Sequence, residues 1–416
     1  MTRRAERLAL AGVLVVALLI RIAYAVRVGE GPLSGDAIEF GQLARGMADG
    51  HGYVNASLSA LRGIEVPTAD KPPLYPATLA LLDLVGLSST AGHQASGLAS
   101  GTALVLVVAL LAREVSGRRG VGVAAAAIAA VYPPLIMADG SLRSESLFAL
   151  LVASALLAAV RFRRRPALST SLVGGACVAL AALTRGEALL LVGLLPLAIA
   201  VGRPVGVRPR HGAVAAAAVA VVLVPWLVRC YAAFDQVVLI STNTGGLVAG
   251  ANCDDSYYGP NTGGWTFSCL GNGFGLSTNE ATAANALRDQ GVDYARAHAG
   301  RLPAVLVARV GRTFDVRHPR ALAGEQRFFE GRDLRVAQAG VAAFYLVVLA
   351  ALIGLLSRRL ARTDVLVLLS PVVVVVFVTV TAYGWIRLRV GAEPALVVLA
   401  ATGLSVLLDR VRARAQ

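Results

Sequence analysis

Long runs of Ala, Val and Leu recur along this 416-residue chain, and they limit its possible folds more than any other feature. A helix needs about 20 mainly apolar residues to cross the hydrocarbon core of a bilayer. Charged residues make up only 15% of the sequence and cluster between these runs, whereas about 25% is usual in a soluble domain. The pattern predicts an all-α polytopic membrane protein.

We expect about ten transmembrane helices and two extended polar regions. The apolar runs lie at residues 8–28, 93–113, 121–138, 145–161, 170–184, 187–202, 213–231, 336–356, 364–382 and 392–408. The pair at 170–184 and 187–202 is shorter than most of the others. The chain then divides into an N-terminal transmembrane half that includes a first polar loop, a second polar region and C-terminal helices, at 1–231 (loop 29–92), 232–335 and 336–416.

The distribution of arginine predicts the orientation of these helices. If the basic N-terminus lies in the cytoplasm and the helices alternate, every short basic loop falls on the cytoplasmic side, as the positive-inside rule requires. Both extended polar regions then lie outside. No signal-peptide cleavage pattern follows the first apolar run, so we expect that run to remain as a first span. The Ala-, Arg- and Val-rich composition indicates a bacterial cell membrane.

Lysine and arginine outnumber aspartate and glutamate by 39 to 25, which gives a formal charge of +14. In a soluble protein this excess would suggest a nucleic-acid partner. Here the basic residues lie mainly in short loops between apolar runs, where they set orientation and contact anionic lipid headgroups. We therefore expect membrane lipids, and not nucleic acid, as partners.

The first polar loop carries two charged residues at expected membrane boundaries. Asp36 begins a segment in which Phe40, Leu43 and Met47 share one helical face. It is therefore either a helix cap or a carboxylate held at the lipid–water boundary as a general base or metal ligand. Lys71 precedes two prolines, and its ammonium group either reaches ordinary headgroups or binds a phosphate ligand.

Three further outer corners place several charges in very little loop. They hold Asp139, Arg143 and Glu145 between the third and fourth spans, Arg185 and Glu187 between the fifth and sixth, and Arg387, Arg389 and Glu393 before the last. Charges at a membrane boundary are costly unless they are paired or functional. Pairing within a corner, or of Arg185 with a neighbouring helix, is one interpretation. The arginines of the last corner break the positive-inside tendency and suit a phosphate ligand.

The outer corners are charged, whereas no span carries a charge ladder through its middle. This distribution favours chemistry at the outer surface over conduction across the membrane. The sequence has no glycine-rich phosphate loop, CxxC pair or HExxH motif. Cys253 and Cys269 share a polar outer loop, where a disulfide is permitted. Gly97 and Gly101 form a small-xxx-small pattern that indicates close helix packing.

Several segments, in order along the whole chain, resemble the GT-C superfamily of membrane glycosyltransferases, in particular the bacterial protein-mannosyltransferase-like and aminoarabinose-transferase-like (ArnT-type) enzymes. They are LLIRIAYA, GDAIEF, LARGMADGHGY, KPPLYPATLA, YPPLI…SLRSESLF, ALTRGEALLL, STNTGG and RLRVGAEPAL. The resemblance implies a GT-C-like bundle with an extracytoplasmic site. It also implies a polyprenyl-phosphate sugar donor and no nucleotide.

The resemblance also implies roles for the acidic residues. Asp36 matches the family's catalytic aspartate, and Glu145 matches the acidic residue of the second outer loop. The neighbouring Asp139 joins them as a catalytic candidate. A divalent metal ion held by Asp36 and Glu145 could assist the reaction.

The basic positions near the lipid phosphate in the family match Lys71, Arg185, Arg387 and Arg389. Two positions depart from the family pattern. Phe40 stands where Tyr is more common, so a hydroxyl contact is lost, and Gly186 stands where Pro is usual. Neither departure removes a charge.

We therefore expect a hexosyl- or pentosyltransferase in which Asp36 deprotonates an acceptor hydroxyl. The acceptor is a protein, a lipid or a glycan. One alternative is a transporter or flippase of a lipid-linked sugar, which would need charges or broken helices at mid-membrane depth. The other is a polymerase or ligase of envelope glycans that does not need the aspartate.

Overall fold

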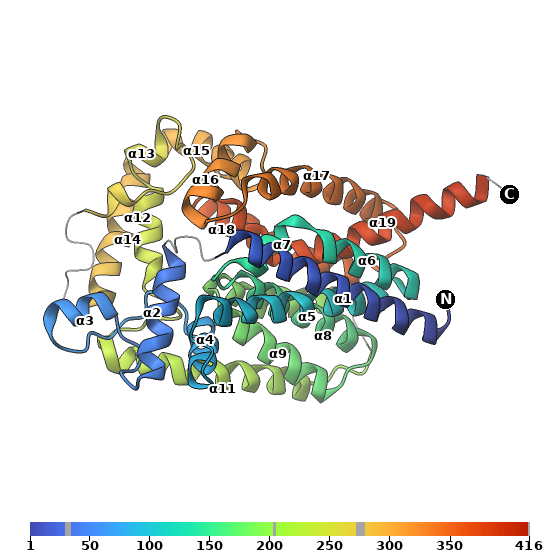
Figure 1. The fold of residues 1–416 in the computed structure, drawn as a ribbon, viewed down its shortest axis with the longest axis horizontal. Coiled ribbons are helices and arrows are strands. Elements are labelled where there is room, and N and C mark those ends of the chain that lie inside the picture. The colour runs from blue at the N-terminus through green and yellow to red at the C-terminus, as the bar shows by residue number, and fades with distance from the viewer. Residues whose placement is uncertain (30–34, 203–204, 272–278, 415–416) are drawn as a thin grey trace.

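The chain is a bundle of long helices with shorter helices gathered at one end (Figure 1). A computed structural model describes residues 1–29, 35–202, 205–271 and 279–414. Within those ranges the backbone forms no β-strand, only an isolated bridge between Val54 and Pro67. The expected all-α polytopic fold is confirmed.

Seven helices of the described chain are long and apolar enough to cross a membrane. They are α1 (Arg3–Val28), α5 (Thr90–Ser116), α8 (Glu145–Arg164), α11 (Pro209–Phe234), α17 (Leu334–Leu356), α18 (Arg362–Thr381) and α19 (Glu393–Arg414). Helices α6 (Arg119–Val131) and α7 (Pro133–Gly140) pass the same test only together, with a bend of 56° between them. The bend falls at Tyr132, directly before two prolines, and a residue that precedes proline is disfavoured in the helical region.

The two shortest expected spans form helices that are shorter than a bilayer core. Helix α9 (Leu168–Ala182) has 15 residues, and α10 (Leu190–Val201), preceded by the 3₁₀ turn η1 (Gly186–Leu189), has 12. A helix rises about 1.5 Å per residue, so neither reaches the roughly 30 Å of a hydrocarbon core. By helix length the described chain therefore has seven or eight complete spans, fewer than the ten that the apolar runs predict.

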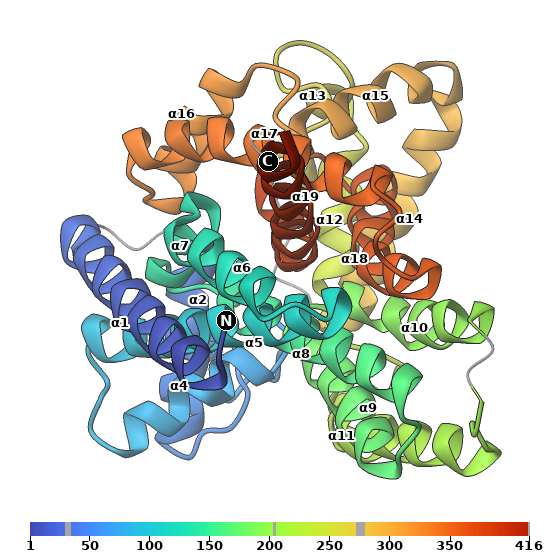
Figure 2. The ribbon, with the colours of Figure 1, turned by 90° about the vertical axis from the view of Figure 1, so that its right-hand side faces the viewer.

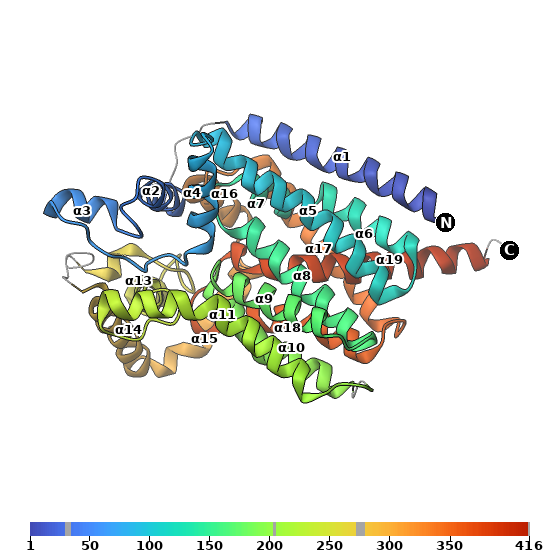
Figure 3. The same cartoon turned by 90° about the horizontal axis from the view of Figure 1, so that it is seen from below.

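Several of the short basic loops lie together at one end of the bundle. Arg118 and Arg359, from two of the short basic loops, both pair with Asp409 near the C-terminus. Arg113 pairs with Glu6 near the N-terminus. Figures 1 and 3 show both termini at this end of the molecule and the polar insertions at the opposite end. The basic loops and the two polar regions therefore occupy opposite ends, as the orientation argument requires.

The polar insertions form short helices that cover one end of the bundle. They are α2 (Asp36–Ala48), α3 (Ala56–Arg62), α4 (Leu74–Leu84), α12 (Asn243–Ala251), α13 (Asp254–Tyr257), η2 (Phe267–Leu270), α14 (Glu280–Ala297), η3 (Ala299–Arg301), α15 (Leu302–Thr313) and α16 (Pro319–Glu330). A last 3₁₀ turn, η4 (Ile386–Gly391), joins α18 to α19. Phe40 of α2 packs edge-on against Tyr75 of α4, with ring centroids 4.9 Å apart. An apolar ring therefore fits position 40.

A buried ion pair joins α1 to α7 inside the bundle. Figure 2 shows the ribbons of these two helices in a view along the bundle. Arg21 Nε lies 2.6 Å from Asp139 Oδ2, and the hydroxyl of Ser146 donates to Asp139 Oδ1. The other guanidinium N–H groups of Arg21 donate to backbone carbonyls. A Cβ at Gly97 or Gly101 of α5 would lie about 2 Å from atoms of Asp139. The close packing expected from these glycines is confirmed.

Candidate active site

Asp36 lies at the start of α2, and its carboxylate faces three cations. Its Oδ1 is 3.1 Å from Lys71 Nζ, and its Oδ2 is 3.1 Å from Arg143 Nη1 and 2.6 Å from Arg387 Nη1. The N-cap position of α2 is Gly35, at a φ of 52°. Burial alone would raise the pKa of Asp36, but Arg387, Lys71 and Arg143 outweigh that effect and hold the pKa well below its ordinary value. The carboxylate is therefore ionised at neutral pH.

Lys71 stands among three carboxylates. Its Nζ lies 3.1 Å from Asp36, 2.8 Å from Glu39 and 3.0 Å from Asp70, so each N–H of the ammonium has an acidic neighbour. Burial would lower the pKa of Lys71, but Asp70, Asp36 and Glu39 raise it well above its ordinary value. Lys71 is also the only lysine in the sequence, and the other 38 of the 39 lysine and arginine residues are arginines.

Arg387 links Asp36 to a second acidic position at the start of α8. The Nη1 of Arg387 is 2.6 Å from Asp36 and 3.7 Å from Glu145 Oε1. Arg185 Nη1 lies 3.6 Å from the same Glu145 oxygen, and Arg185 Nε contacts Glu187 at 2.6 Å. Both expected pairings of Arg185, within its corner and with a neighbouring helix, are therefore present. Neither oxygen of Glu145 has a hydrogen-bond partner in the described chain, which leaves acceptor capacity at the centre of the cluster.

Arg389 lies on another side of η4 and has different partners. It contacts Asp315 at 2.8 Å and Glu393 at 3.2 Å, and its guanidinium stacks on the Phe344 ring. One cavity connects it to Arg387 and Glu145, with a volume of about 20 Å³, which is room for roughly one water molecule. Arg389 is therefore paired with Asp315 and Glu393, beside the cluster around Asp36 and not within it.

Sequence reasoning missed the contribution of α16 and the residues after it. Glu330 accepts from Trp385 Nε1 at 2.5 Å and contacts Arg332 at 2.7 Å. Burial would raise the pKa of Glu330, but Arg332, Arg143 and Arg387 lower it. Arg143 also donates to the carbonyl of Phe329. The sequence offers only one signal for this part of the site, namely that Glu330 and Arg332 lie close to the start of the expected span 336–356. Contacts between segments far apart in the sequence leave no local pattern.

The structure does not bring Asp139 to this cluster. Its partners are Arg21 and Ser146 inside the bundle, because α7 directs the side chain toward α1 and α5. Cys253, directly before α13, forms a disulfide with Cys269 of η2, within the second polar region. Of the expected site residues, the catalytic candidates Asp36 and Glu145 and the phosphate-binding candidates Lys71, Arg185 and Arg387 thus lie together.

Asp36 and Glu145, the expected metal ligands, do not fit a divalent ion as they are arranged. The Arg387 guanidinium lies between their oxygens, and Lys71 and Arg143 take the remaining approach to Asp36. A metal ion at these two carboxylates would have to displace the cations that contact them. Across the described ranges, no group of three or more His, Cys, Asp or Glu side chains is placed to hold a metal.

A protein-family model matches part of the chain. Residues 70–228 match the family model described as dolichyl-phosphate-mannose-protein mannosyltransferase. The matched range contains Lys71, Arg143, Glu145 and Arg185, and it ends within α11. No curated protein sequence matches the chain.

Solved structures show a similar fold along the whole chain. The archaeal oligosaccharyltransferase AglB from Archaeoglobus fulgidus, in complex with an inhibitory peptide and a dolichol-phosphate, aligns over 97% of this chain at 15% identity and a TM-score of 0.57. The same enzyme in complex with Zn and sulfate aligns at 17% identity and a TM-score of 0.56. ArnT from Cupriavidus metallidurans, bound to undecaprenyl phosphate, aligns at 15% identity and a TM-score of 0.46.

This chain is shorter than the solved structures that it resembles. The chain spans 51% of the AglB chain and 78% of the ArnT chain. At this level of identity the similarity concerns the fold. The expected resemblance is nevertheless confirmed, because this chain has a GT-C-like helical membrane fold and its residues 70–228 match the family of dolichyl-phosphate-mannose-protein mannosyltransferases.

Proposed function

We propose that this protein is a glycosyltransferase that moves a sugar from a polyprenyl-phosphate donor to an acceptor hydroxyl at the extracytoplasmic face of a bacterial cell membrane. The observation that carries the proposal is the ionised Asp36 carboxylate among Lys71, Arg143 and Arg387. A carboxylate in contact with three cations at one end of a bundle can supply a base, and the cations can bind a leaving phosphate. AglB, which has the same fold, is solved with a dolichol-phosphate.

The proposed reaction uses these groups in one displacement. Asp36 accepts the proton of the acceptor hydroxyl, and the acceptor oxygen forms a bond to the anomeric carbon of the sugar. The bond from that carbon to the phosphate oxygen breaks, and the lipid phosphate leaves with its electron pair. Lys71, Arg185 and Arg387 stabilise the negative charge that grows on the phosphate. A preorganised donor of this kind contributes about 3 kcal/mol to the transition state.

Donor binding also improves Asp36 as a base. Without a ligand, Arg387, Lys71 and Arg143 overcome the effect of burial and keep the pKa of Asp36 low, and a low pKa makes a weak base. A phosphate that shares Lys71 and Arg387 offsets part of their positive charge and moves the pKa of Asp36 upward. The base becomes effective when the leaving group is in place.

The arrangement of the chain supports an orientation with both termini in the cytoplasm. The short basic loops lie with the termini, and the proposed site lies at the opposite end, as positive-inside insertion places them. We assign the catalytic groups mainly to residues 1–231, the acceptor side to residues 232–335 and membrane anchoring to residues 336–416, with Arg387 as the contribution of the last part. Protein, lipid and glycan hydroxyls are all candidate acceptors.

Sugar transfer by the purified full chain tests the proposal. Defined polyprenyl-phosphate sugars serve as donors, and wild type is compared with Asp36→Asn and with Asp289→Asn, a control at an exposed position of α14. We expect transfer by wild type and the control, and a loss of about 10²- to 10⁴-fold in Asp36→Asn. Equal transfer by a folded Asp36→Asn would contradict the base and favour an envelope-glycan polymerase or ligase. Carrier binding without transfer by wild type would favour a flippase.

A further inference from the structure

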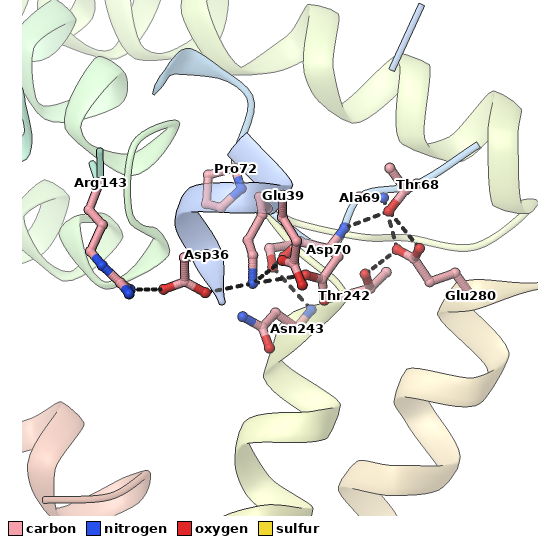
Figure 4. Close-up of polar contacts among 12 residues, drawn as sticks. Asp36, Glu39, Thr68, Ala69, Asp70, Pro72, Arg143, Thr242, Asn243 and Glu280 are labelled. Atoms are coloured by element: carbon pink, nitrogen blue, oxygen red, sulfur yellow. Dashed lines mark hydrogen bonds and ion pairs between the residues drawn. The ribbon is translucent and has the colours of Figure 1, made fainter. Parts of the chain in front are cut away.

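Glu280, the first residue of α14, reaches across to the segment that carries Lys71 (Figure 4). Its Oε1 accepts a hydrogen bond from the backbone N–H of Ala69 at 2.8 Å, and its Oε2 accepts one from the hydroxyl of Thr68 at 2.6 Å. The hydroxyl of Thr242 donates to the same carboxylate. One side chain of the second polar region thus holds two consecutive residues of the first.

A simpler explanation for an acidic residue in this position is a favourable charge at a helix N-terminus. The capping groups of α14 argue against that as the full explanation, because Asn279 accepts from the N–H groups of Ala281 and Thr282. Burial raises the pKa of the Glu280 carboxyl, even though its three hydrogen bonds act in the other direction. Since a buried carboxylate is costly unless its hydrogen bonds are made, this side chain is suited to hold its partners in one geometry.

Neighbouring contacts extend the connection to Lys71 itself. The N–H of Thr242 donates to the Ala69 carbonyl at 3.0 Å, and the hydroxyl of Ser241 donates to the Asp70 carbonyl at 2.6 Å. The Asp70 carboxylate lies 3.0 Å from Lys71 Nζ. The chain from Glu280 to the ammonium therefore consists of short polar contacts, most of which Figure 4 shows together.

The opposite side of the segment is held independently. Arg229 of α11 donates to the carbonyls of Thr68 at 2.6 Å and Tyr53 at 2.5 Å, and the hydroxyl of Tyr53 donates to the Lys71 carbonyl at 2.8 Å. These contacts hold the backbone on the side that faces α11 and Tyr53. The side that faces the second polar region depends on Glu280 and its neighbours.

We propose that Glu280 is a positioning residue that fixes the segment from Thr68 to Lys71, so that the Lys71 ammonium stands beside Asp36. Its consequence for catalysis rests on the proposed function, but the placement of Lys71 can be measured without any substrate. Lys71 is the only lysine of the sequence and is 8% exposed. An amine-acetylating reagent therefore reports on this one side chain.

The test measures the acetylation rate of Lys71 by peptide mass spectrometry in the purified full chain. The variants are Glu280→Ala, Glu280→Gln and the control Asp289→Ala on the same helix, where the side chain is 65% exposed. We expect Glu280→Ala to react at least about fivefold faster than wild type, since the segment opens locally. Glu280→Gln should stay within about twofold, because its carboxamide can accept from the Ala69 N–H and donate to the Thr68 hydroxyl. The control should react as wild type does.

A milder variant covers the case in which Glu280→Ala does not fold. Thr242→Val removes only the third hydrogen bond of the carboxylate and should accelerate the reaction by about twofold. Melting temperature and size-exclusion profile show which variants are folded. Wild-type acetylation rates in folded Glu280→Ala, or in folded Thr242→Val where the alanine variant fails to fold, would overturn the inference.

Transfer kinetics then separate this inference from the proposed function. Glu280→Ala should lose about 10- to 100-fold in kcat, as misplaced catalytic groups do, and Glu280→Gln should restore most of it. If wild type transfers no sugar but the acetylation rates follow the expected order, the proposed function fails and the positioning role stands. If Glu280→Ala exposes Lys71 and keeps full transfer activity, the positioning role in catalysis is wrong.

Discussion

Two groups of buried charges in this protein differ in how completely their atoms are paired. The Arg21–Asp139 pair is enclosed by helices, and Ser146 and backbone carbonyls take up the remaining hydrogen bonds. In the cluster around Asp36, the carboxylates and cations at its centre have two or three opposite neighbours each. Even so, Arg387 Nε and both Glu145 oxygens lack hydrogen-bond partners in the described chain. The Asp36 side chain is also 22% exposed.

The difference teaches how to separate a structural pair from a reactive one in a membrane bundle. A pair with all its hydrogen bonds made can only lose by rearranging, so it holds helices in place. A cluster with spare donors and acceptors next to solvent can exchange a protein partner for a ligand. The comparison predicts that changes in the two groups affect different measurements, stability in one and transfer in the other.

Among the changes that test this comparison, the largest effect is expected from Arg387→Met. This change removes the guanidinium between Asp36 and Glu145, and loss of one preorganised donor typically costs about 10²- to 10³-fold in kcat. Sugar-transfer kinetics measure it. The melting temperature should fall less than in Arg21→Met, because Asp36 keeps Lys71 and Arg143 and Glu145 keeps Arg185. A variant that melts early and keeps its specific activity would place Arg387 with the structural group.

Arg21→Met should have the opposite signature. It leaves Asp139 as an unpaired buried charge, which costs about 3–5 kcal/mol of unfolding free energy. Unfolding in detergent measures the loss, and the folded fraction should transfer sugar normally. The double variant Arg21→Met/Asp139→Leu should recover most of the stability, because no charge remains buried. A strong loss of kcat in folded Arg21→Met would break the comparison.

Gly101→Ala sharpens the same side of the comparison. Its Cβ would lie 2.1 Å from the Asp139 carboxylate, so the pair must shift, at a cost of about 1–3 kcal/mol. Thermal unfolding measures it. Gly12→Ala in α1, where a Cβ meets nothing within 4 Å, is the matched control and should leave stability unchanged or slightly increased.

The smallest effect is expected in the pH dependence of activity, and it concerns only the cluster around Asp36. Arg387, Lys71 and Arg143 depress the folded-state pKa of Asp36 against the effect of burial, so its contribution to stability is present above its ordinary pKa and is lost as pH falls through the folded-state value. Lys71→Met removes one of the three cations, so the pKa of Asp36 moves upward. The acidic limb of the kcat/KM profile should then shift to higher pH, with weaker overall activity. An unshifted limb would show that Asp36 does not set it.

Much of the fold follows from the sequence, because apolar runs determine which segments become helices. The exceptions have local reasons. The run at 121–138 contains Pro133 and Pro134, and the structure divides it into α6 and α7. The runs at 170–184 and 187–202 are apolar enough to cross a membrane. The corner with Arg185 and Glu187 interrupts the helical structure between them, so that α9 ends at Ala182 and α10 begins at Leu190.

The sequence allows individual residues of the candidate site to be predicted, but not their positions relative to one another. Asp36, Lys71 and Arg387 stand out as charges at membrane boundaries, and so does Asp139, although its side chain points into the bundle. No local pattern distinguishes Asp139 from Asp36, because packing of α7 against α1 decides the direction. Gly186 shows the same limit, since a Cβ there would meet Ile240 at an ordinary 3.6 Å, and nothing in the structure requires glycine.

The turn η4 has a consequence for how such a protein could diversify. A 3₁₀ helix makes about three residues per turn, so two arginines spaced by one residue point to different sides: Arg387 to Asp36 and Arg389 to Asp315. One added or deleted residue would turn both guanidinium groups away from their partners at once. We therefore expect the length of this one turn to be constrained more tightly than that of the loops whose residues make no contact with the cluster around Asp36.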